Sequence, residues 1–297
     1  MIELKNVKKR FDGAPALDGL TLTVPRGSVY GMVGPNGAGK STAIRHISGI
    51  LRPDSGEVLV GGEPVYENTG VKARMAYIPD DVHFLPQTCV NDMRRFYERM
   101  YPSFDAAVFE KLRDAFDIDP KQPIRRLSRG MQKQAAFWLA LPMRPDRLIL
   151  DEPMDGLDPV MRRQIWSIVM GDVAENGTTV LVSSHNLREL EDVCDHVGIM
   201  NRGKMLLERD LGELQESITK LQVVLPEGAA LPDGLDILHE TDSGRMKTLI
   251  VRGGRREITE RLSCASPVYL DAVPLTLEEI FIYELGGVSY EVKDILL

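Results

Sequence analysis

A glycine-rich segment at residues 34–42 places the strongest constraint on the fold of this chain. It reads Gly34-Pro35-Asn36-Gly37-Ala38-Gly39-Lys40-Ser41-Thr42 and matches the pattern G-x-x-x-x-G-K-S/T. The apolar run 29–33 before it predicts a buried strand, and a helix is predicted over 41–50. Because a chance glycine-rich turn would lack this strand–loop–helix context, we interpret all nine residues as a loop that binds a nucleoside triphosphate.

The residue types of this loop suit phosphate binding. Glycines allow the backbone to curl so that successive N–H groups point at phosphate oxygens, and the following helix adds partial positive charge at its N-terminus. We expect Lys40 to reach the β- and γ-phosphates and the Ser41 hydroxyl to help hold Mg²⁺, the expected cofactor with the nucleotide.

A pair of acids ends an apolar strand predicted over 148–150. Such a strand delivers the next side chains, Asp151 and Glu152, to the carboxyl edge of a parallel sheet, beside the phosphate-binding loop. We expect Asp151 to bind Mg²⁺ and Glu152 to polarise a water aimed at the γ-phosphate. The alternative is a solvated acidic turn, which the neighbouring loop makes the weaker interpretation.

The composition excludes several classes of protein. With 297 residues, 43% hydrophobic and 27% charged, the chain is expected to fold into one large and one small globular domain. A net charge of −8 argues against a broad nucleic-acid-binding face, so no nucleic-acid partner is expected. Three scattered cysteines fit a reducing cytosol. The sequence shows no signal peptide and no bilayer-spanning run, so a membrane process would require another chain.

Strands and helices alternate along the first two thirds of the chain. After a hairpin over 2–24, this alternation predicts a mainly parallel α/β sheet. Helical spacing occupies 88–118, 128–141, 159–176 and 186–194. After about Leu211 the pattern changes to short strands, with helices at 255–262 and 277–285, which predicts a small α+β domain over 212–297.

Further motifs make residues 2–211 resemble the ATPase subunit of an ABC transporter. Residues 127–132, with Ser128 and Gly130, resemble the signature LSGGQ; residues 156–158 resemble the D-loop; His185 resembles the switch histidine; and Phe11 stands where the family stacks a ring on adenine. The resemblance implies a P-loop NTPase cassette over 1–211, with an N-terminal antiparallel β subdomain and a helical subdomain at about 81–140.

In that family, two ATPase subunits enclose two nucleotides head to tail. The resemblance implies that Ser128 and the Gly130 amide bind the partner's ATP, that Arg129 and Asp158 couple the two sites, and that His185 acts in hydrolysis with Lys40 and Glu152. The alternatives are a core role for Phe11, a structural role for His185, a solvent-facing Arg129, and a helix N-cap at Asp158, which is compatible with coupling.

The sequence departs from the family pattern at two places. Asp80 follows Tyr77-x-Pro79, where the family has a glutamine; it could bind Mg²⁺ or its water but cannot donate an amide hydrogen bond. Arg129 and Met131 replace glycine and glutamine of the signature. We expect altered metal dependence and coupling, with hydrolysis retained.

The resemblance implies an enzyme that converts ATP and water to ADP and phosphate to power transport through separate membrane permease subunits. The protein would be cytoplasmic, at the inner face of the cell membrane, paired with an identical or related ATPase subunit. Its single cassette and residues 277–281 resemble bacterial exporters of drugs, antimicrobial peptides or lipids.

A groove in the helical subdomain would receive a coupling helix of the permease, with internal packing as the alternative. Its candidate residues are Phe84, Leu85, Phe96, Tyr97, Tyr101 and Phe104.

The alternative function is a soluble ABC ATPase acting on ribosomes or nucleic acid, which would require a second cassette or an inserted coiled coil. A non-hydrolysing regulatory subunit is disfavoured by Glu152 and His185. The small C-terminal domain is expected to be accessory or dimer-stabilising.

Overall fold

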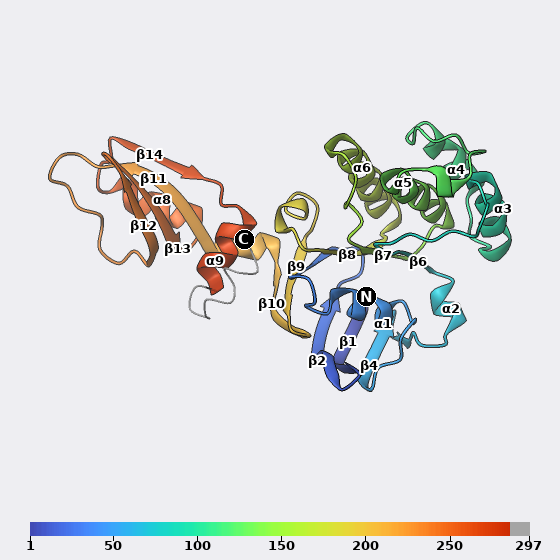
Figure 1. Cartoon of the computed structure of the whole chain (residues 1–297). Coiled ribbons are helices and arrows are strands. Elements are labelled where there is room, and N and C mark those ends of the chain that lie inside the picture. Colours follow the sequence, from blue (N-terminus) through green and yellow to red (C-terminus); the bar gives the residue numbers. More distant parts are fainter. Residues whose placement is uncertain (286–297) are drawn as a thin grey trace. The chain divides into compact units, whose positions relative to one another are not determined.

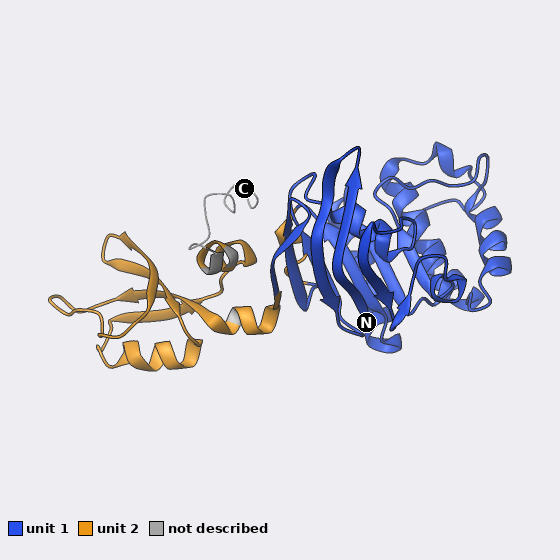
Figure 2. Ribbon diagram, turned by 90° about the horizontal axis from the view of Figure 1, so that it is seen from below, with its two compact units in different colours: residues 1–185, 193–208 blue, residues 186–192, 209–297 orange. Residues whose placement is uncertain are grey.

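A computed structural model describes residues 1–285 and divides the chain into two compact units (Figure 2). The first unit comprises residues 1–185 and 193–208. The second comprises residues 186–192 and the chain from Arg209 onward. Segment 186–192, which the sequence analysis placed within the cassette, therefore packs in the second unit.

An antiparallel sheet forms one layer of the first unit. It consists of β1 (Ile2–Phe11), β2 (Ala14–Val24), β4 (Ser55–Val60) and β5 (Glu63–Pro64), in the order β2-β1-β4-β5. The predicted hairpin between β1 and β2 is confirmed, and its turn residues Asp12 and Gly13 both have positive φ.

A six-stranded sheet forms the centre of the first unit, in the order β10-β9-β3-β8-β7-β6. The strands from β9 to β6 are parallel, which confirms the predicted α/β class. Three of them, β3, β7 and β8, are buried along their whole length, as parallel strands covered on both faces are. The strands are β3 (Val29–Val33), β6 (Met75–Ile78), β7 (Arg147–Asp151), β8 (Thr179–Ser184), β9 (His196–Asn201) and β10 (Lys204–Asp210).

Helices cover both faces of this sheet (Figure 1). Helix α1 (Lys40–Ile47) packs between the two sheets, where Ala43 and Ile44 join a core built from both. Helices α5 (Arg129–Ala140) and α6 (Pro159–Asn176) lie on the opposite face. The other helices of this unit are α2 (Thr69–Lys72), α3 (Val90–Met100) and α4 (Ala106–Arg113), with short 3-10 turns η1 (Ile124–Arg126) and η2 (Leu141–Met143).

The helical pattern predicted over 88–118 forms two helices, α3 and α4. Pro102 cannot continue a helix, and the Asp105 side chain then caps α4 by accepting from the amides of Ala107 and Val108. The Trp138 ring stacks on Phe109 with centroids 4.9 Å apart, and its Nε1 donates to the Phe109 carbonyl at 2.8 Å. This contact joins α4 to α5.

The second unit is a small α+β fold. Its antiparallel sheet has the order β12-β13-β11-β14, and a core of residues such as Leu221, Val251 and Leu262 lies between the sheet and α8. The elements are α7 (Leu211–Ser217), β11 (Ile218–Val224), β12 (Ile237–Ser243), β13 (Met246–Arg252), α8 (Arg255–Ser263), β14 (Tyr269–Val273) and α9 (Leu277–Leu285).

The helix predicted over 186–194 is wrong. Only the 3-10 turn η3 (Leu187–Glu189) forms there, because the Asn186 side chain accepts from the Arg188 amide and Glu191 is engaged by the first amide of α9. Of the helices in residues 1–285, none combines the length and apolar character needed to cross a bilayer.

Candidate active site

The phosphate-binding loop connects β3 to α1, as the sequence predicts. Gly39 caps α1 with a φ of 105°, and a Cβ there would lie 2.7 Å from the Ala16 carbonyl oxygen. A Cβ at Gly34 would collide with the Met200 carbonyl. Both positions therefore require glycine, which lets the loop backbone approach neighbouring strands closely.

Lys40 lies inside this loop with a side chain that is only 6% exposed. Its Nζ donates to the carbonyl of Gly34 at 2.6 Å and to that of Pro35 at 3.4 Å, and it lies 3.2 Å from Glu152 Oε1. The ammonium is thus placed at the mouth of the amide-lined loop, where an anionic phosphate would compete with the Glu152 carboxylate for it.

Asp151 ends β7 with its carboxylate buried beside two hydroxyl groups. Its Oδ1 accepts from Ser183 Oγ at 2.7 Å and from Ser41 Oγ at 3.1 Å. Burial raises the pKa of this carboxyl, and the hydrogen bonds from Ser183 and Ser41 partly oppose that effect. Among residues 1–285, Asp151 forms no ion pair. A buried carboxylate next to a serine hydroxyl offers the hard oxygen ligands that suit Mg²⁺.

Glu152 follows Asp151 with a left-handed backbone, at a φ of 44°. Its Oε2 lies 2.9 Å from His185 Nδ1 and accepts from the His185 amide at 3.2 Å. The Glu152 amide in turn donates to Ser183 at the end of β8. The Glu152 carboxylate is therefore held between His185 and Lys40.

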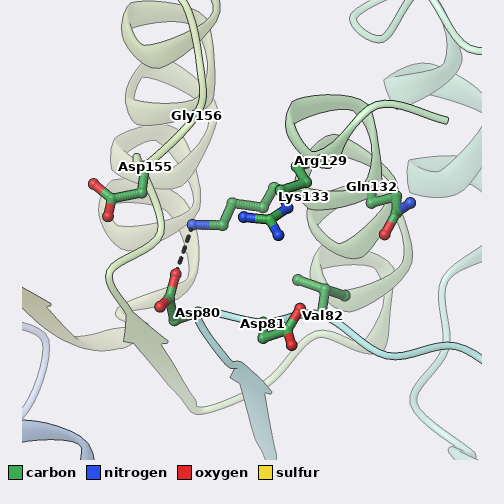
Figure 3. A pocket seen from close by; sticks show the side chains of 8 residues that line it. All are labelled: Asp80, Asp81, Val82, Arg129, Gln132, Lys133, Asp155 and Gly156. Atoms are coloured by element: carbon green, nitrogen blue, oxygen red, sulfur yellow. Dashed lines mark hydrogen bonds and ion pairs between the residues drawn. The ribbon is translucent and has the colours of Figure 1, made fainter.

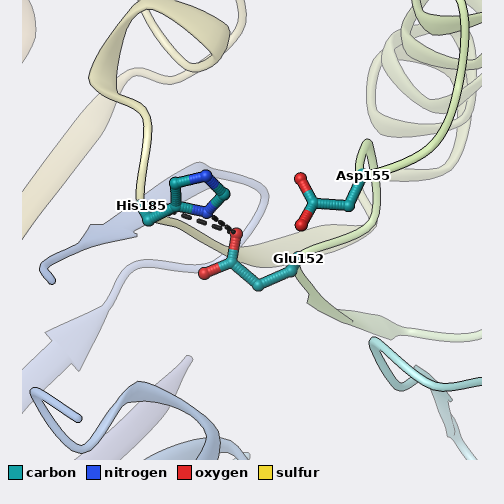
Figure 4. A group of neighbouring side chains, drawn as sticks. All are labelled: Glu152, Asp155 and His185. Carbon is teal, nitrogen blue, oxygen red and sulfur yellow. Dashed lines mark hydrogen bonds and ion pairs between the residues drawn. The ribbon is translucent and has the colours of Figure 1, made fainter. Parts of the chain in front are cut away.

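Asp155 is a further acid at this site that the sequence analysis did not single out. Its carboxylate faces the Glu152–His185 pair (Figure 4), and one ligand atom of each residue lies within 4.8 Å of the other two. The available signal was its position three residues after Glu152, in the turn that leads to the D-loop.

Lys133 is the second residue missed from sequence. Its Nζ donates to Asp80 Oδ1 at 3.2 Å and to the Glu152 carbonyl at 2.6 Å. Lys133 and Asp80 border a cavity of about 400 Å³ that is also lined by Asp81, Arg129 and Asp155 (Figure 3). The available signal was a lysine in α5 shortly before the apolar run 135–140.

The signature and the D-loop meet in this structure. A Cβ at Gly130 would lie 2.7 Å from the Gly156 carbonyl oxygen, so α5 packs directly on the D-loop. Ser128 caps α5 by accepting from the Met131 amide, and Asp158 caps α6 by accepting from two amides, which is the N-cap arrangement considered above. Within the described part of the chain, no hydrogen bond joins Ser128, Arg129 or Asp158 to the phosphate-binding loop.

Phe11 stands at the end of β1 with 44% of its surface exposed, so it is not a core residue. Lys9 Nζ lies 5.6 Å from the centre of its ring. The exposed ring leaves a π-face open for stacking, and its contact with adenine stays a prediction.

The aromatic residues of the helical subdomain divide into two groups. Phe84, Tyr97 and Tyr101 line a cavity of about 220 Å³ together with β6, and burial raises the pKa of Tyr97. Leu85 and Phe96 are exposed. Phe104 instead packs on Phe109, with ring centroids 6.2 Å apart, as the internal-packing alternative describes.

Comparisons with known proteins agree with the motifs. A family model described as "ABC transporter" matches residues 17–155. The ABC transporter ATP-binding protein YtrB of Bacillus subtilis (strain 168) is 31% identical over 290 residues, which cover 97% of this chain and 99% of YtrB. The daunorubicin/doxorubicin resistance ATP-binding protein DrrA of Streptomyces peucetius is 34% identical over 226 residues, 73% of this chain and 67% of DrrA.

Solved structures show the same fold. An ATP-binding subunit of an ABC transporter superposes with a TM-score of 0.66 at 26% identity, covering 72% of this chain and 92% of that one. The cassette MJ0796, solved as a dimer in a post-hydrolysis state with ADP and Pi, has a TM-score of 0.64 at 22% identity and covers 71% of this chain and 99% of that one. The chain therefore belongs to the family of ATP-binding subunits of ABC transporters, and it is an ATPase with the P-loop NTPase fold.

Proposed function

We propose that this ATPase hydrolyses MgATP to drive export through separate membrane subunits. The observation that carries the proposal is the hydrogen-bonded group around the phosphate-binding loop, in which Lys40, Ser41, Asp151, Glu152 and His185 converge from three segments. The relative DrrA, named for resistance to daunorubicin and doxorubicin, supports a drug as the cargo among the drugs, antimicrobial peptides and lipids considered above.

The bound nucleotide would rearrange the charges of the site. The Lys40 ammonium would exchange the Glu152 carboxylate for γ-phosphate oxygens, which frees Glu152 to take a proton from the attacking water. His185 would turn from Glu152 toward the γ-phosphate. Mg²⁺ held by Ser41 and Asp151 would supply charge neutralisation on the phosphates.

A second subunit would complete each site. Ser128 is exposed at the N-terminus of α5, where the helix dipole and the Gly130 amide favour an anion. We place the γ-phosphate held by the partner there, with Arg129 and Asp158 at the shared boundary. The partner is either a second copy of this chain or a related one.

The permease would dock at the helical subdomain. The cavity lined by Phe84, Tyr97 and Tyr101, with Phe96 and Leu85 exposed, offers aromatic side chains to one coupling helix. This docking would hold the protein at the inner face of the cell membrane, on the cytoplasmic side.

The second unit would be an accessory domain that responds to the nucleotide. Segment 186–192, which directly follows His185, is fastened to α9: the Arg188 guanidinium binds Glu278 Oε2 at 2.9 and 3.1 Å, and the Leu277 amide donates to Glu191 Oε1 at 3.0 Å. Movement of His185 would therefore pull on a segment held by this unit.

Co-purification distinguishes this function from the alternative function, a soluble ABC ATPase acting on ribosomes or nucleic acid. The Glu152→Gln chain, loaded with MgATP in its native cells, is expected to co-purify with an integral membrane protein. Sedimentation with ribosomes, in the absence of any membrane partner, would favour the alternative function instead.

A further inference from the structure

The Lys133 ammonium joins two segments of the active site that are far apart in sequence. One bond reaches Asp80, 53 residues away and just after β6; the other reaches the backbone of Glu152, just after β7. Figure 3 shows the lysine extending across the cavity from α5 to Asp80. The Lys133 side chain is 6% exposed, whereas that of Asp80 is 58% exposed.

The burial of these groups indicates which bond matters more for position. An ion pair whose acid is this exposed is screened by solvent and contributes little by itself. The bond to the Glu152 carbonyl is shorter, at 2.6 Å, and is charge-assisted. The Asp155 amide, which also donates to that carbonyl, is farther away at 3.4 Å.

Glu152 needs such an anchor because its backbone lies in the left-handed region, which is unfavourable for a residue with a side chain. Its amide is fixed by Ser183 and its carboxylate by His185 and Lys40. When a nucleotide takes the Lys40 ammonium and the His185 ring away from the carboxylate, the backbone contacts of Glu152 and the His185 amide are left to direct it.

We propose that Lys133 is a positioning residue for hydrolysis: it holds the Glu152 carbonyl so that the carboxylate points at the attacking water, and Asp80 holds Lys133. This inference rests on the proposed role of Glu152 as general base. It gives Asp80 a task, the support of a buried cation, that does not require contact with Mg²⁺.

The test compares two variants. Lys133→Met keeps most of the length of the side chain but removes its charge, and Lys111→Met removes an exposed lysine of α4. We expect kcat to fall about 10-fold in Lys133→Met, because a small misplacement of a catalytic group is costly. The KM for ATP and the affinity for a fluorescent ATP analogue should change less than about 3-fold. Lys111→Met should have the same kcat and KM as the protein without substitutions.

Two further variants separate positioning from general damage. Asp80→Asn should lose less activity than Lys133→Met, and the double variant should be no worse than Lys133→Met, because Asp80 acts through the lysine. In a Glu152→Gln background, Lys133→Met should cause no additional loss. Should Lys133→Met fail to fold, Lys133→Gln combined with Asp80→Asn avoids an unpaired charge, and the same drop in kcat is expected.

A folded Lys133 variant with an unchanged kcat, or with a loss confined to ATP affinity, would overturn the inference. A further loss in the Glu152→Gln background would do the same. Failure of the proposed role of Glu152 has a different signature, since the Glu152→Gln protein would then hydrolyse ATP at a near-normal rate.

Discussion

The Lys40 ammonium lies 3.2 Å from the Glu152 carboxylate, so the phosphate-binding lysine and the proposed general base neutralise each other. Both side chains are largely buried, at 6% and 11% exposed. We expect a triphosphate that enters the loop to displace one from the other. In the mechanism that we propose, the base is therefore held near the loop before ATP arrives, and binding of ATP would free that base to act.

Replacing Asp151 by asparagine should stabilise the protein without nucleotide while removing its response to Mg²⁺. Burial raises the pKa of Asp151, so the folded state binds a proton more readily than the unfolded state, and stability falls as the pH rises through the interval above 3.8. Asp151→Asn removes the cost of the buried charge that persists at pH 7. Thermal unfolding with and without MgATP measures both effects; a lower melting temperature without ligand would contradict this interpretation.

ATP should drive two subunits together when hydrolysis is blocked. In a Glu152→Gln background, light scattering with ATP is expected to show a dimer, and Ser128→Arg should abolish it by filling the space for the partner's γ-phosphate. Ser128→Ala is the matched control: loss of the N-cap of α5 should cost about 1 kcal/mol of stability without blocking association sterically. The same mass with and without ATP would argue against a shared site.

The two tasks considered for Asp80 give different metal dependences. If its main contact is the ion pair with Lys133, then Asp80→Gln and Asp80→Ala should leave the Mg²⁺ concentration for half-maximal hydrolysis within about twofold of the original value. The sequence-based expectation of metal ligation requires a clear rightward shift instead. Steady-state hydrolysis over a Mg²⁺ titration decides between them.

Reversing the charge of Glu278 should change hydrolysis without changing ATP binding. Arg188 is 73% exposed, so solvent screens this ion pair and Glu278→Arg should change the stability of the protein little. ATP-driven dimerisation or turnover should change, however, because the Arg188–Glu278 pair fastens the segment after His185 to α9. The charge-swapped pair Arg188→Glu with Glu278→Arg should restore it. Unaltered turnover in Glu278→Arg would mean that this attachment transmits nothing.

Truncation of the second unit tests the role of this whole unit in dimerisation and turnover. A chain ending near Leu211 should still bind MgATP, since all the motif residues precede that position. The cut also exposes Leu187 and Leu190, which are buried in the second unit, so solubility must be checked first. A soluble truncation that loses nucleotide binding outright would place the second unit within the active site.

The sequence predicted the elements whose signal is local. The runs 29–33 and 148–150 are continuous apolar strands next to chemically specific residues, and both strands form. The segment 186–194 has helical spacing, but contacts with a helix about 90 residues later replace most of that helix with a turn. Strand β10 and helix α7, around the predicted domain boundary, were not anticipated.

Site residues could be predicted from the sequence only where they occupy a defined position in a known motif. Lys40, Ser41, Asp151, Glu152 and His185 occupy fixed places in recognised patterns, and the structure brings them together. Lys133 and Asp155 belong to no pattern that we used. Their roles emerge from the packing of α5 on the D-loop, which depends on tertiary contacts rather than on local sequence.

We propose that Glu152 is the base that ATP binding releases, and the Glu152→Gln variant tests this role most directly. The amide keeps the shape of the side chain but cannot accept the proton, and it removes the carboxylate that neutralises Lys40. We use Glu175→Gln, an exposed position on α6, as the control.

Single-turnover hydrolysis measured beside ATP binding in the same preparation is the decisive measurement. We expect a fall of about 10²-fold or more in the hydrolysis rate of Glu152→Gln, with ATP affinity retained or increased. Near-normal turnover in the folded Glu152→Gln protein would contradict it.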